Sequence, residues 1–168
     1  MARTCTLKGN PLNLAGPELK VGDKVPDATL RKDLFTDFRI AAGRGKVRIF
    51  SVVPSLDTPV CARQTKRFNE EAANLPNVEF CTISCDLPTA QKRFCGAEGI
   101  DPERVIALSD HRDLSFGEAY GTLIPDLRLL CRAVFVVDRD DTLRYVEYVP
   151  ELGDQPNYDA VLAAARAL

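Results

Sequence analysis

Two adjacent segments constrain the fold of this chain more than any other feature: a mostly apolar run at residues 47–53 and an amphipathic pattern at residues 62–75. The run is long and apolar enough for a central strand that is covered on both faces. The second segment has a helical period, and its inward face is formed by Cys61, Thr65, Phe68, Ala72 and Leu75. A buried strand followed by an amphipathic helix predicts an α/β fold in which the helix packs on a sheet.

Strand and helix patterns alternate along the rest of the chain. Two short strands at residues 4–7 and 12–14, separated by Lys-Gly-Asn-Pro, predict an N-terminal β-hairpin. Further strands are predicted at residues 28–30, 37–40, 78–84, 105–108, 133–138 and 143–148, and further helices at residues 88–97, 115–120 and 158–168. Asn157 is expected to cap the last helix. This order predicts one domain over residues 1–168, with a mixed sheet between layers of helices.

Composition and charge argue against several classes of protein. The formal net charge is −2 and no block of Lys or Arg exceeds two residues, so no nucleic-acid-binding tract is indicated. The apolar runs fall far short of the roughly 20 residues needed to span a bilayer, and no membrane association is expected. The first residues lack the apolar core of a signal peptide, which favours a cytoplasmic protein.

The chain contains six cysteines. It has no Cys-x-x-Cys, and its only histidine, His111, has no cysteine at zinc-finger spacing, so a structural zinc site is not expected. A disulfide framework is not expected either, because the chain is long enough for a core and lacks an export signal. Most of the cysteines are therefore expected to be small buried residues. Cys5 lies in a hairpin that looks exposed, and it is given no role.

Cys61 differs from the others because it lies where an anionic sulfur would be stabilised. Thr58 is placed to cap the helix, Pro59 suits its first position, and Cys61 then falls at the third helical position. Backbone N–H groups are unpaired in that turn and the helix dipole is positive there. A thiolate is the nucleophilic form of cysteine. The Thr58 hydroxyl is placed to donate to the sulfur or to a bound oxygen.

Two motifs connect this local chemistry with a known family. Residues 54–61 read Pro-Ser-Leu-Asp-Thr-Pro-Val-Cys, which resembles the Pro-x-x-x-Thr-x-x-Cys active site of the peroxiredoxins. The full string is similar to that of their thiol peroxidase subgroup. Residues 86–99 read Asp-Leu-Pro-Thr-Ala-Gln-Lys-Arg-Phe-Cys-Gly-Ala-Glu-Gly and resemble the second hallmark segment of that subgroup. The resemblance covers nearly the whole chain and implies a thioredoxin-like fold and an atypical 2-Cys peroxidase.

The resemblance implies a role for each matching residue. Cys61 looks like the peroxidatic cysteine, whose thiolate attacks a hydroperoxide and becomes a sulfenic acid. Pro54 would form a wall of the pocket, and Thr58 would hold the peroxide and orient the sulfur. Arg132, just before the strand at residues 133–138, matches an arginine that stabilises the thiolate and the charge developing on the leaving oxygen.

Cys95 looks like the resolving cysteine of the same family. It would attack the sulfenic sulfur and form an intramolecular Cys61–Cys95 disulfide, which protects Cys61 from irreversible over-oxidation. Each cysteine is predicted on its own helix, and a disulfide requires Cα atoms within about 7 Å, so one or both helices are expected to unwind. The family also implies thioredoxin as the electron donor, a homodimer and no bound cofactor.

The other cysteines leave alternatives open. Cys85 lies close to the second motif and is a rival or auxiliary resolving thiol. Cys81 and Cys85 would share one face of their strand, and core packing is the simpler interpretation for both. Cys131, next to Arg132, is within reach of the pocket, but packing is again favoured. The preferred peroxide is also open; alkyl or lipid hydroperoxides are favoured by three apolar neighbours of the motifs, Leu56, Val60 and Phe94.

Several other functions fit parts of the sequence. Residues 61–67 satisfy the Cys-x5-Arg spacing of cysteine phosphatases, but this segment has no glycine and its pattern is helical. A dithiol oxidoreductase would need Cys-x-x-Cys, and a Cys–His protease would depend on His111 alone. A non-catalytic binding domain with a thioredoxin-like fold would leave the arrangement of Thr58, Cys61 and Arg132 without a purpose.

Overall fold

The computed structural model describes residues 2–168 of the chain. Its centre is a seven-stranded mixed sheet with the strand order β11-β10-β5-β6-β7-β3-β4. The strands are β3 (Thr29–Arg31), β4 (Asp37–Arg39), β5 (Val47–Val52), β6 (Val78–Ser84), β7 (Val105–Ser109), β10 (Ala133–Val137) and β11 (Leu143–Tyr148). β5, β6 and β7 run parallel, and the remaining neighbours pair antiparallel. Together with the helices described next, this sheet confirms the predicted α/β class.

One face of the sheet is covered by helices. These are α1 (Pro59–Ala72), α2 (Pro88–Glu98) and α4 (Tyr158–Arg166). Their apolar side chains pack with those of the sheet in a helix-side core that includes Ile49, Phe68, Phe80, Val134 and Val161. Gly99 ends α2 in the left-handed conformation that glycine adopts without strain.

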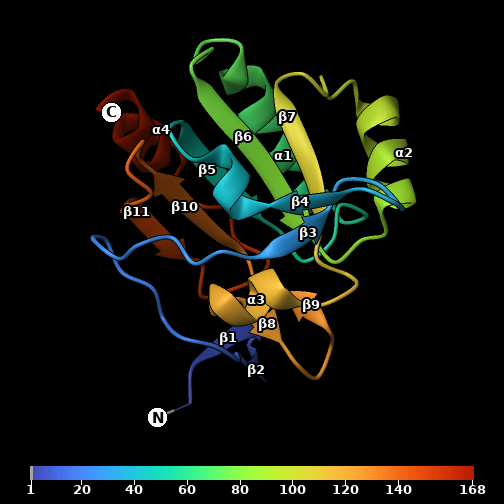
Figure 1. Cartoon of the computed structure of the whole chain (residues 1–168). Helices are drawn as coiled ribbons and strands as arrows, with labels where there is room; N and C mark the ends of the chain where they lie inside the picture. The colour runs from blue at the N-terminus through green and yellow to red at the C-terminus, as the bar shows by residue number, and fades with distance from the viewer. Residues whose placement is uncertain (1) are drawn as a thin grey trace.

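The other face carries the short elements, which gather at the lower end of the view in Figure 1. They are α3 (Ser115–Ala119), β8 (Leu123–Ile124), β9 (Leu129–Leu130), and an N-terminal hairpin of β1 (Thr4–Leu7) and β2 (Asn10–Asn13). The opposite core on this side contains Phe50, Phe116 and Tyr120, with the last two rings stacked 4.0 Å apart. Because β5 places Ile49 in one core and Phe50 in the other, it is buried on both faces, as predicted.

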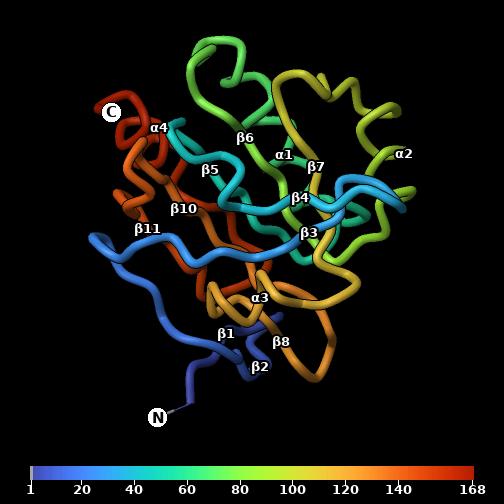
Figure 2. Tube along the Cα trace, viewed as in Figure 1, coloured from blue at the N-terminus to red at the C-terminus, as the bar shows by residue number. Residues whose placement is uncertain are grey.

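The N-terminal hairpin confirms one prediction and corrects another. Lys8 and Gly9 both have positive φ, as a tight two-residue turn requires, so β2 begins earlier than predicted. Cys5 is 3% exposed, contrary to the expectation of an exposed position. The reason is a distant contact: β1 is hydrogen-bonded to residues 150–152, and Cys5 thereby enters the opposite core. Figure 2 shows the chain leaving this hairpin and running as a long extended segment toward β3.

Other predicted bounds shift for local reasons. α1 ends at Ala72, because the amides of Asn74 and Leu75 bond to carbonyls only three residues back. Ile40 begins a short 3-10 helix, η1 (Ile40–Gly43), instead of ending a strand. Asn157 caps α4 as predicted, its side chain accepting from the amide of Ala160 at 3.1 Å. Across residues 2–168, no helix combines the length and the apolar character needed to cross a membrane.

Candidate active site

Cys61 lies in the first turn of α1, shortly after the end of β5. Thr58 is the N-cap residue, Pro59 is the first helical residue and Cys61 is the third, which is the predicted placement. The sulfur therefore lies in the turn whose backbone N–H groups lack helical partners. The hydroxyl of Thr58 donates to the carbonyl of Ser55 at 2.8 Å, rather than accepting from a helix amide as expected of a cap. Thr58 is exposed, whereas Cys61 is 1% exposed.

Arg132 approaches the sulfur from the segment that precedes β10. Its Nη2 donates to Cys61 Sγ at 3.2 Å. The carbonyl of Leu152 accepts from Nε at 3.1 Å and from Nη2 at 2.8 Å, and these bonds fix the guanidinium in place. None of the ion pairs formed within residues 2–168 includes Arg132. A buried guanidinium with no carboxylate partner presents its positive charge directly to the Cys61 sulfur.

Gln64 holds this arginine, and the sequence analysis did not identify it. Its Oε1 accepts from Arg132 Nη1 at 2.8 Å, and its Nε2 donates to Ser51 Oγ at 2.7 Å. The signal was present, since Gln64 is a polar residue one turn after Cys61, and a polar side chain on a buried helix face needs a partner. Because Gln64 is neutral, it orients the guanidinium without neutralising its charge.

The other surroundings of Cys61 are apolar. Cys61 forms a small buried cluster with Val53 and Leu56, and Phe94 of α2 packs against this cluster. Pro54 is buried as well and lies in the loop between β5 and α1. The cluster thus connects Cys61 with the helix that carries the second predicted cysteine.

Cys95 follows Phe94 in α2. It is partly buried against the helix-side core and also lines an open groove of about 560 Å³ between α2 and the β3–β4 hairpin. All six cysteines are free thiols, and Cys61 and Cys95 lie on two regular helices. The structure therefore brings Cys61 and Arg132 into contact, and it leaves Cys95 on the neighbouring helix as an unbonded thiol.

The remaining four cysteines belong to the opposite core. Cys5, Cys81 and Cys131 are buried in it, and Cys85 packs against it. Cys81 and Cys85 thus share one side of the sheet, as predicted, and this is not the side on which α1 packs. None of these four cysteines belongs to the apolar cluster around Cys61.

Burial also sets the protonation of these thiols. It is the main cause that raises the pKa of Cys85 and of Cys131 to about 12, and the carboxylates of Asp110 and Asp86 add to the effect at Cys85. Burial likewise raises the pKa of Cys95 and is the main cause of the raised pKa values of Cys5 and Cys81. These thiols stay protonated near neutral pH and are weak nucleophiles.

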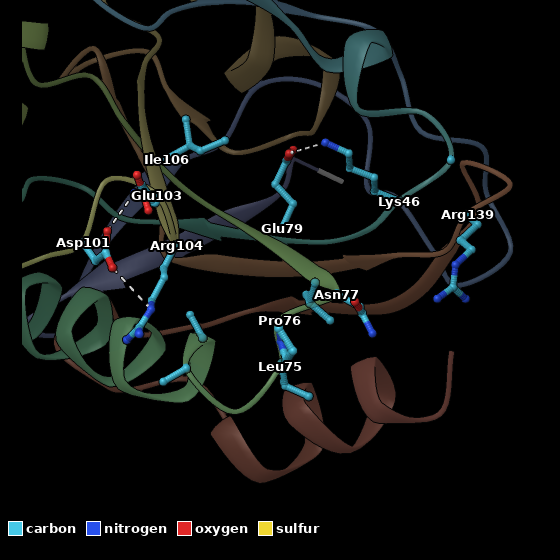
Figure 3. Close-up of a pocket in the computed structure, with 14 residues that line it drawn as sticks. Lys46, Leu75, Pro76, Asn77, Glu79, Asp101, Glu103, Arg104, Ile106 and Arg139 are labelled. Atoms are coloured by element: carbon cyan, nitrogen blue, oxygen red, sulfur yellow. Dashed lines mark hydrogen bonds and ion pairs between the residues drawn. The ribbon is translucent and has the colours of Figure 1, made fainter.

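A cavity of about 720 Å³ lies elsewhere, where β5, β6 and β7 begin (Figure 3). Its charged side chains largely pair with one another: Lys46 with Glu79 at 3.4 Å and Arg104 with Asp101 at 3.3 Å. Its lining contains no cysteine among the described residues, and it takes no part in the chemistry of Cys61.

The geometry does not match a cysteine phosphatase. Residues 61–67 belong to a regular helix, and Arg67 is paired with Glu71 at 3.2 Å, so they do not form the phosphate-binding loop of a cysteine phosphatase. No group of three or more His, Cys, Asp or Glu side chains is placed to hold a metal ion in the part of the chain that the structure describes.

A mixed sheet covered by helices, with a cysteine in the first turn of a helix and in contact with a buried arginine, defines a thiol-based oxidoreductase. Comparison with known proteins supplies the family. The Redoxin family model matches residues 20–162. The thiol peroxidase of Halalkalibacterium halodurans is 54% identical over 162 residues, covering 96% of each chain. That of Bacillus subtilis is 54% identical over 163 residues, covering 97% of this chain and 96% of the relative.

The chain therefore belongs to the Redoxin family, among its thiol peroxidases, and is a thiol-dependent peroxidase. Solved structures agree with this assignment. A peroxiredoxin-like protein from Aquifex aeolicus is 43% identical with a TM-score of 0.90, covering 99% of this chain and 98% of that one. A thiol peroxidase from Chromobacterium violaceum, 21% identical with a TM-score of 0.84, covers 98% of this chain and 95% of its own, and shows the same fold.

Proposed function

We propose that Cys61 is the thiol that the hydroperoxide oxidises and that Cys95 restores it through a disulfide. The observation that carries the proposal is the hydrogen bond of 3.2 Å from Arg132 Nη2 to Cys61 Sγ. Within residues 2–168, no other cysteine sulfur accepts a hydrogen bond from an arginine, and the other five thiols have raised pKa values.

In the first step, the Cys61 thiolate attacks the terminal oxygen of the hydroperoxide. The O–O bond breaks, the sulfur becomes a sulfenic acid, and the departing alkoxide takes a proton and leaves as an alcohol or as water. Arg132 stabilises the thiolate before the attack and the charge on the leaving oxygen during it. Thr58 exchanges its bond to Ser55 for one to the peroxide, and Pro54 closes the apolar side of the pocket.

In the second step, Cys95 loses its proton and attacks the sulfenic sulfur; an S–S bond forms and water leaves. Burial raises the pKa of Cys95, so its thiol is a weak nucleophile while α2 is folded. Unwinding around Cys95 moves the sulfur toward Cys61 and also exposes it to water, which returns its pKa toward the ordinary value of 9.0. α2 is suited to this change, because Pro88 and Gln91 are its only buried residues.

Thioredoxin, a dithiol protein, then reduces the disulfide. Cys95 is the accessible sulfur of the pair, since it lines an open groove while Cys61 is 1% exposed. Attack on Cys95 releases the Cys61 sulfur as a thiolate, which Arg132 stabilises as a leaving group. The second thiol of thioredoxin then attacks the mixed disulfide and frees Cys95.

The surroundings of Cys61 favour alkyl hydroperoxides over hydrogen peroxide. Leu56 and Phe94 contribute apolar surface beside the sulfur. An apolar substituent on the peroxide would gain binding energy there that hydrogen peroxide does not. The second-order rate constants for cumene hydroperoxide and hydrogen peroxide measure this preference, and a faster reaction with hydrogen peroxide would contradict it.

We also propose that the enzyme works in the cytoplasm as a homodimer. Six free thiols suit a reducing compartment, where thioredoxin operates. The dimer is expected from the resemblance to the thiol peroxidases. Light scattering of the reduced protein at working concentration checks it, and the mass of a single chain would contradict it.

One experiment tests the two cysteine assignments together. Reduced enzyme receives one equivalent of hydroperoxide, free thiols are then blocked, and the disulfides are mapped by mass spectrometry. The expected product is a Cys61–Cys95 disulfide. A Cys61–Cys85 disulfide would give Cys85 the resolving role, and the absence of any disulfide would indicate a mechanism with one cysteine.

A further inference from the structure

A partly buried carboxylate links the loop before Cys61 to the helix of Cys95. Asp86, between β6 and α2, accepts from Ser55 Oγ at 2.8 Å and from the amide of Leu56 at 2.8 Å. Ser55 in turn holds the hydroxyl of Thr58 through its carbonyl. Asp86 thereby fixes the conformation of the loop that carries both the cap of α1 and the hydroxyl proposed to bind the peroxide.

The same carboxylate extends the connection toward α2. Ser84 Oγ donates to Asp86 at 2.7 Å and accepts from Gln91 Nε2 at 3.0 Å. Gln91 also donates to the carbonyl of Leu108 at 2.8 Å and is one of the two buried residues of α2. It lies one helical turn before Cys95, on the same side of the helix. A continuous set of hydrogen bonds therefore joins Thr58 to the turn that precedes the proposed resolving cysteine.

We propose that Asp86 is a positioning residue that keeps both redox helices folded while the peroxide reacts and that must release them before the disulfide forms. This inference rests on the proposed roles of Cys61 and Cys95. While Asp86 keeps its bonds to Ser55, Leu56 and Ser84, the loop stays ordered even after the Thr58 hydroxyl turns to the peroxide, and α2 keeps Cys95 away from the sulfenic acid. Their loss frees the loop and the first turns of α2 together, so the two segments rearrange as one unit.

The hydrogen bonds of Gln91, at the α2 end of this set, are the least costly to break. Gln91 Oε1 is buried and has no hydrogen-bond partner among the described residues, so half of its amide group is already unsatisfied. Exposure of Gln91 to water would satisfy that oxygen, which offsets part of the cost of breaking the two bonds from its nitrogen. Asp86 has no such unsatisfied group at the loop, because it already accepts hydrogen bonds from Ser55 and Leu56 there. Exposure to water would therefore not offset the loss of these two bonds.

The proposal predicts opposite effects on the two chemical steps. In Asp86→Asn the loop loses a charged acceptor for two donors, so Thr58 is less well placed and the peroxide reaction slows by about tenfold. The same loss loosens α2, so the conversion of sulfenic acid to disulfide becomes several-fold faster. In Ser84→Ala the contacts of Asp86 with the loop remain. The disulfide step should again be faster than in the parent, but the peroxide step should slow less than in Asp86→Asn.

Rapid quenching with a thiol-alkylating reagent and dimedone, followed by mass spectrometry, measures both rates in single turnovers with cumene hydroperoxide. Asp113→Asn is the matched control, because Asp113 is an exposed carboxylate whose ion pair with Arg112 is long, at 3.9 Å. It should leave both rates at the parent values. Hydrogen exchange of the α2 amides in the reduced proteins provides the second readout, and faster exchange is expected for Asp86→Asn and Ser84→Ala.

The outcomes separate this inference from the proposed function. If the parent enzyme forms no Cys61–Cys95 disulfide, the proposed function fails first. If the parent forms it and both variants keep the parent rates, only the coupling by Asp86 is overturned. A fall of both rates in equal proportion, with unchanged exchange in α2, would show that Asp86 merely supports the fold and would also overturn the proposal.

Discussion

Gln64 Oε1 accepts a hydrogen bond from Arg132 Nη1 at 2.8 Å, so the guanidinium that faces Cys61 is oriented by a neutral side chain. The opposite end of the same amide is fixed by Ser51 of the central strand. A carboxylate at this position would make a stronger bond to the arginine and would also place a negative charge near the sulfur. The neutral partner leaves the positive charge of the arginine directed at the Cys61 sulfur.

Gln64→Glu should therefore slow the reaction with peroxide. The added carboxylate pairs with Arg132 and opposes the negative charge on the Cys61 sulfur, and a loss of about tenfold in the second-order rate constant is expected at neutral pH. Alkylation of Cys61 by iodoacetamide should slow in parallel, because both reactions need the thiolate. Equal rates in the variant and the parent would show that the charge of the arginine partner is immaterial.

Arg132→Lys should slow the reaction with peroxide strongly, although the substitution retains the positive charge. A lysine has one nitrogen, and it cannot serve Cys61, Gln64 and the carbonyl of Leu152 with the geometry of a guanidinium. A fall of roughly a hundredfold in the rate with peroxide is expected, as for the loss of an aligned charge-stabilising donor. Arg63→Lys, on the exposed side of α1, is the control and should react like the parent.

Cys95→Ser should stop turnover without removing the first reaction. One equivalent of peroxide is consumed, the sulfenic acid finds no partner, and excess peroxide drives Cys61 to sulfinic acid, which mass spectrometry detects. Cys85→Ser should keep turnover with thioredoxin close to that of the parent, because Cys85 packs against the opposite core. Continued turnover of Cys95→Ser, or its loss in Cys85→Ser, would move the resolving role away from Cys95.

Local sequence was sufficient for the part of the site that is local in space. Thr58, Pro59 and Cys61 lie within four residues of one strand-to-helix turn, so capping rules placed the sulfur correctly in the first turn of α1. Arg132 is a different case. Its place beside Cys61 depends on the pairing of β10 with β5, which no periodicity reveals, and its match came from the family resemblance.

The parts that sequence did not reveal are held by contacts between distant segments. Cys5 is buried because residues 150–152 bond to β1, and Asp86 contacts the loop before Cys61 through Ser55. The strands β8 and β9 have two residues each, too few for an alternating pattern to be visible. From sequence alone, a short polar residue in a loop, such as Asp86, is indistinguishable from an ordinary turn residue. Its contact with Ser55 becomes visible only when the position of the other loop is known.

Asp110→Asn should change how stability depends on pH. Burial raises the pKa of Asp110 to about 6. Between about pH 4 and pH 6 the folded protein therefore keeps a proton that the unfolded chain releases. As the pH rises through this window, the free energy of unfolding of the parent falls by up to about 3 kcal/mol. The asparagine variant lacks this loss, so its free energy of unfolding relative to the parent should rise across that window and level off above it. Urea titrations at several pH values measure the difference, with Asp154→Asn as an exposed control that should track the parent. A constant difference between Asp110→Asn and the parent would show that this carboxyl titrates normally.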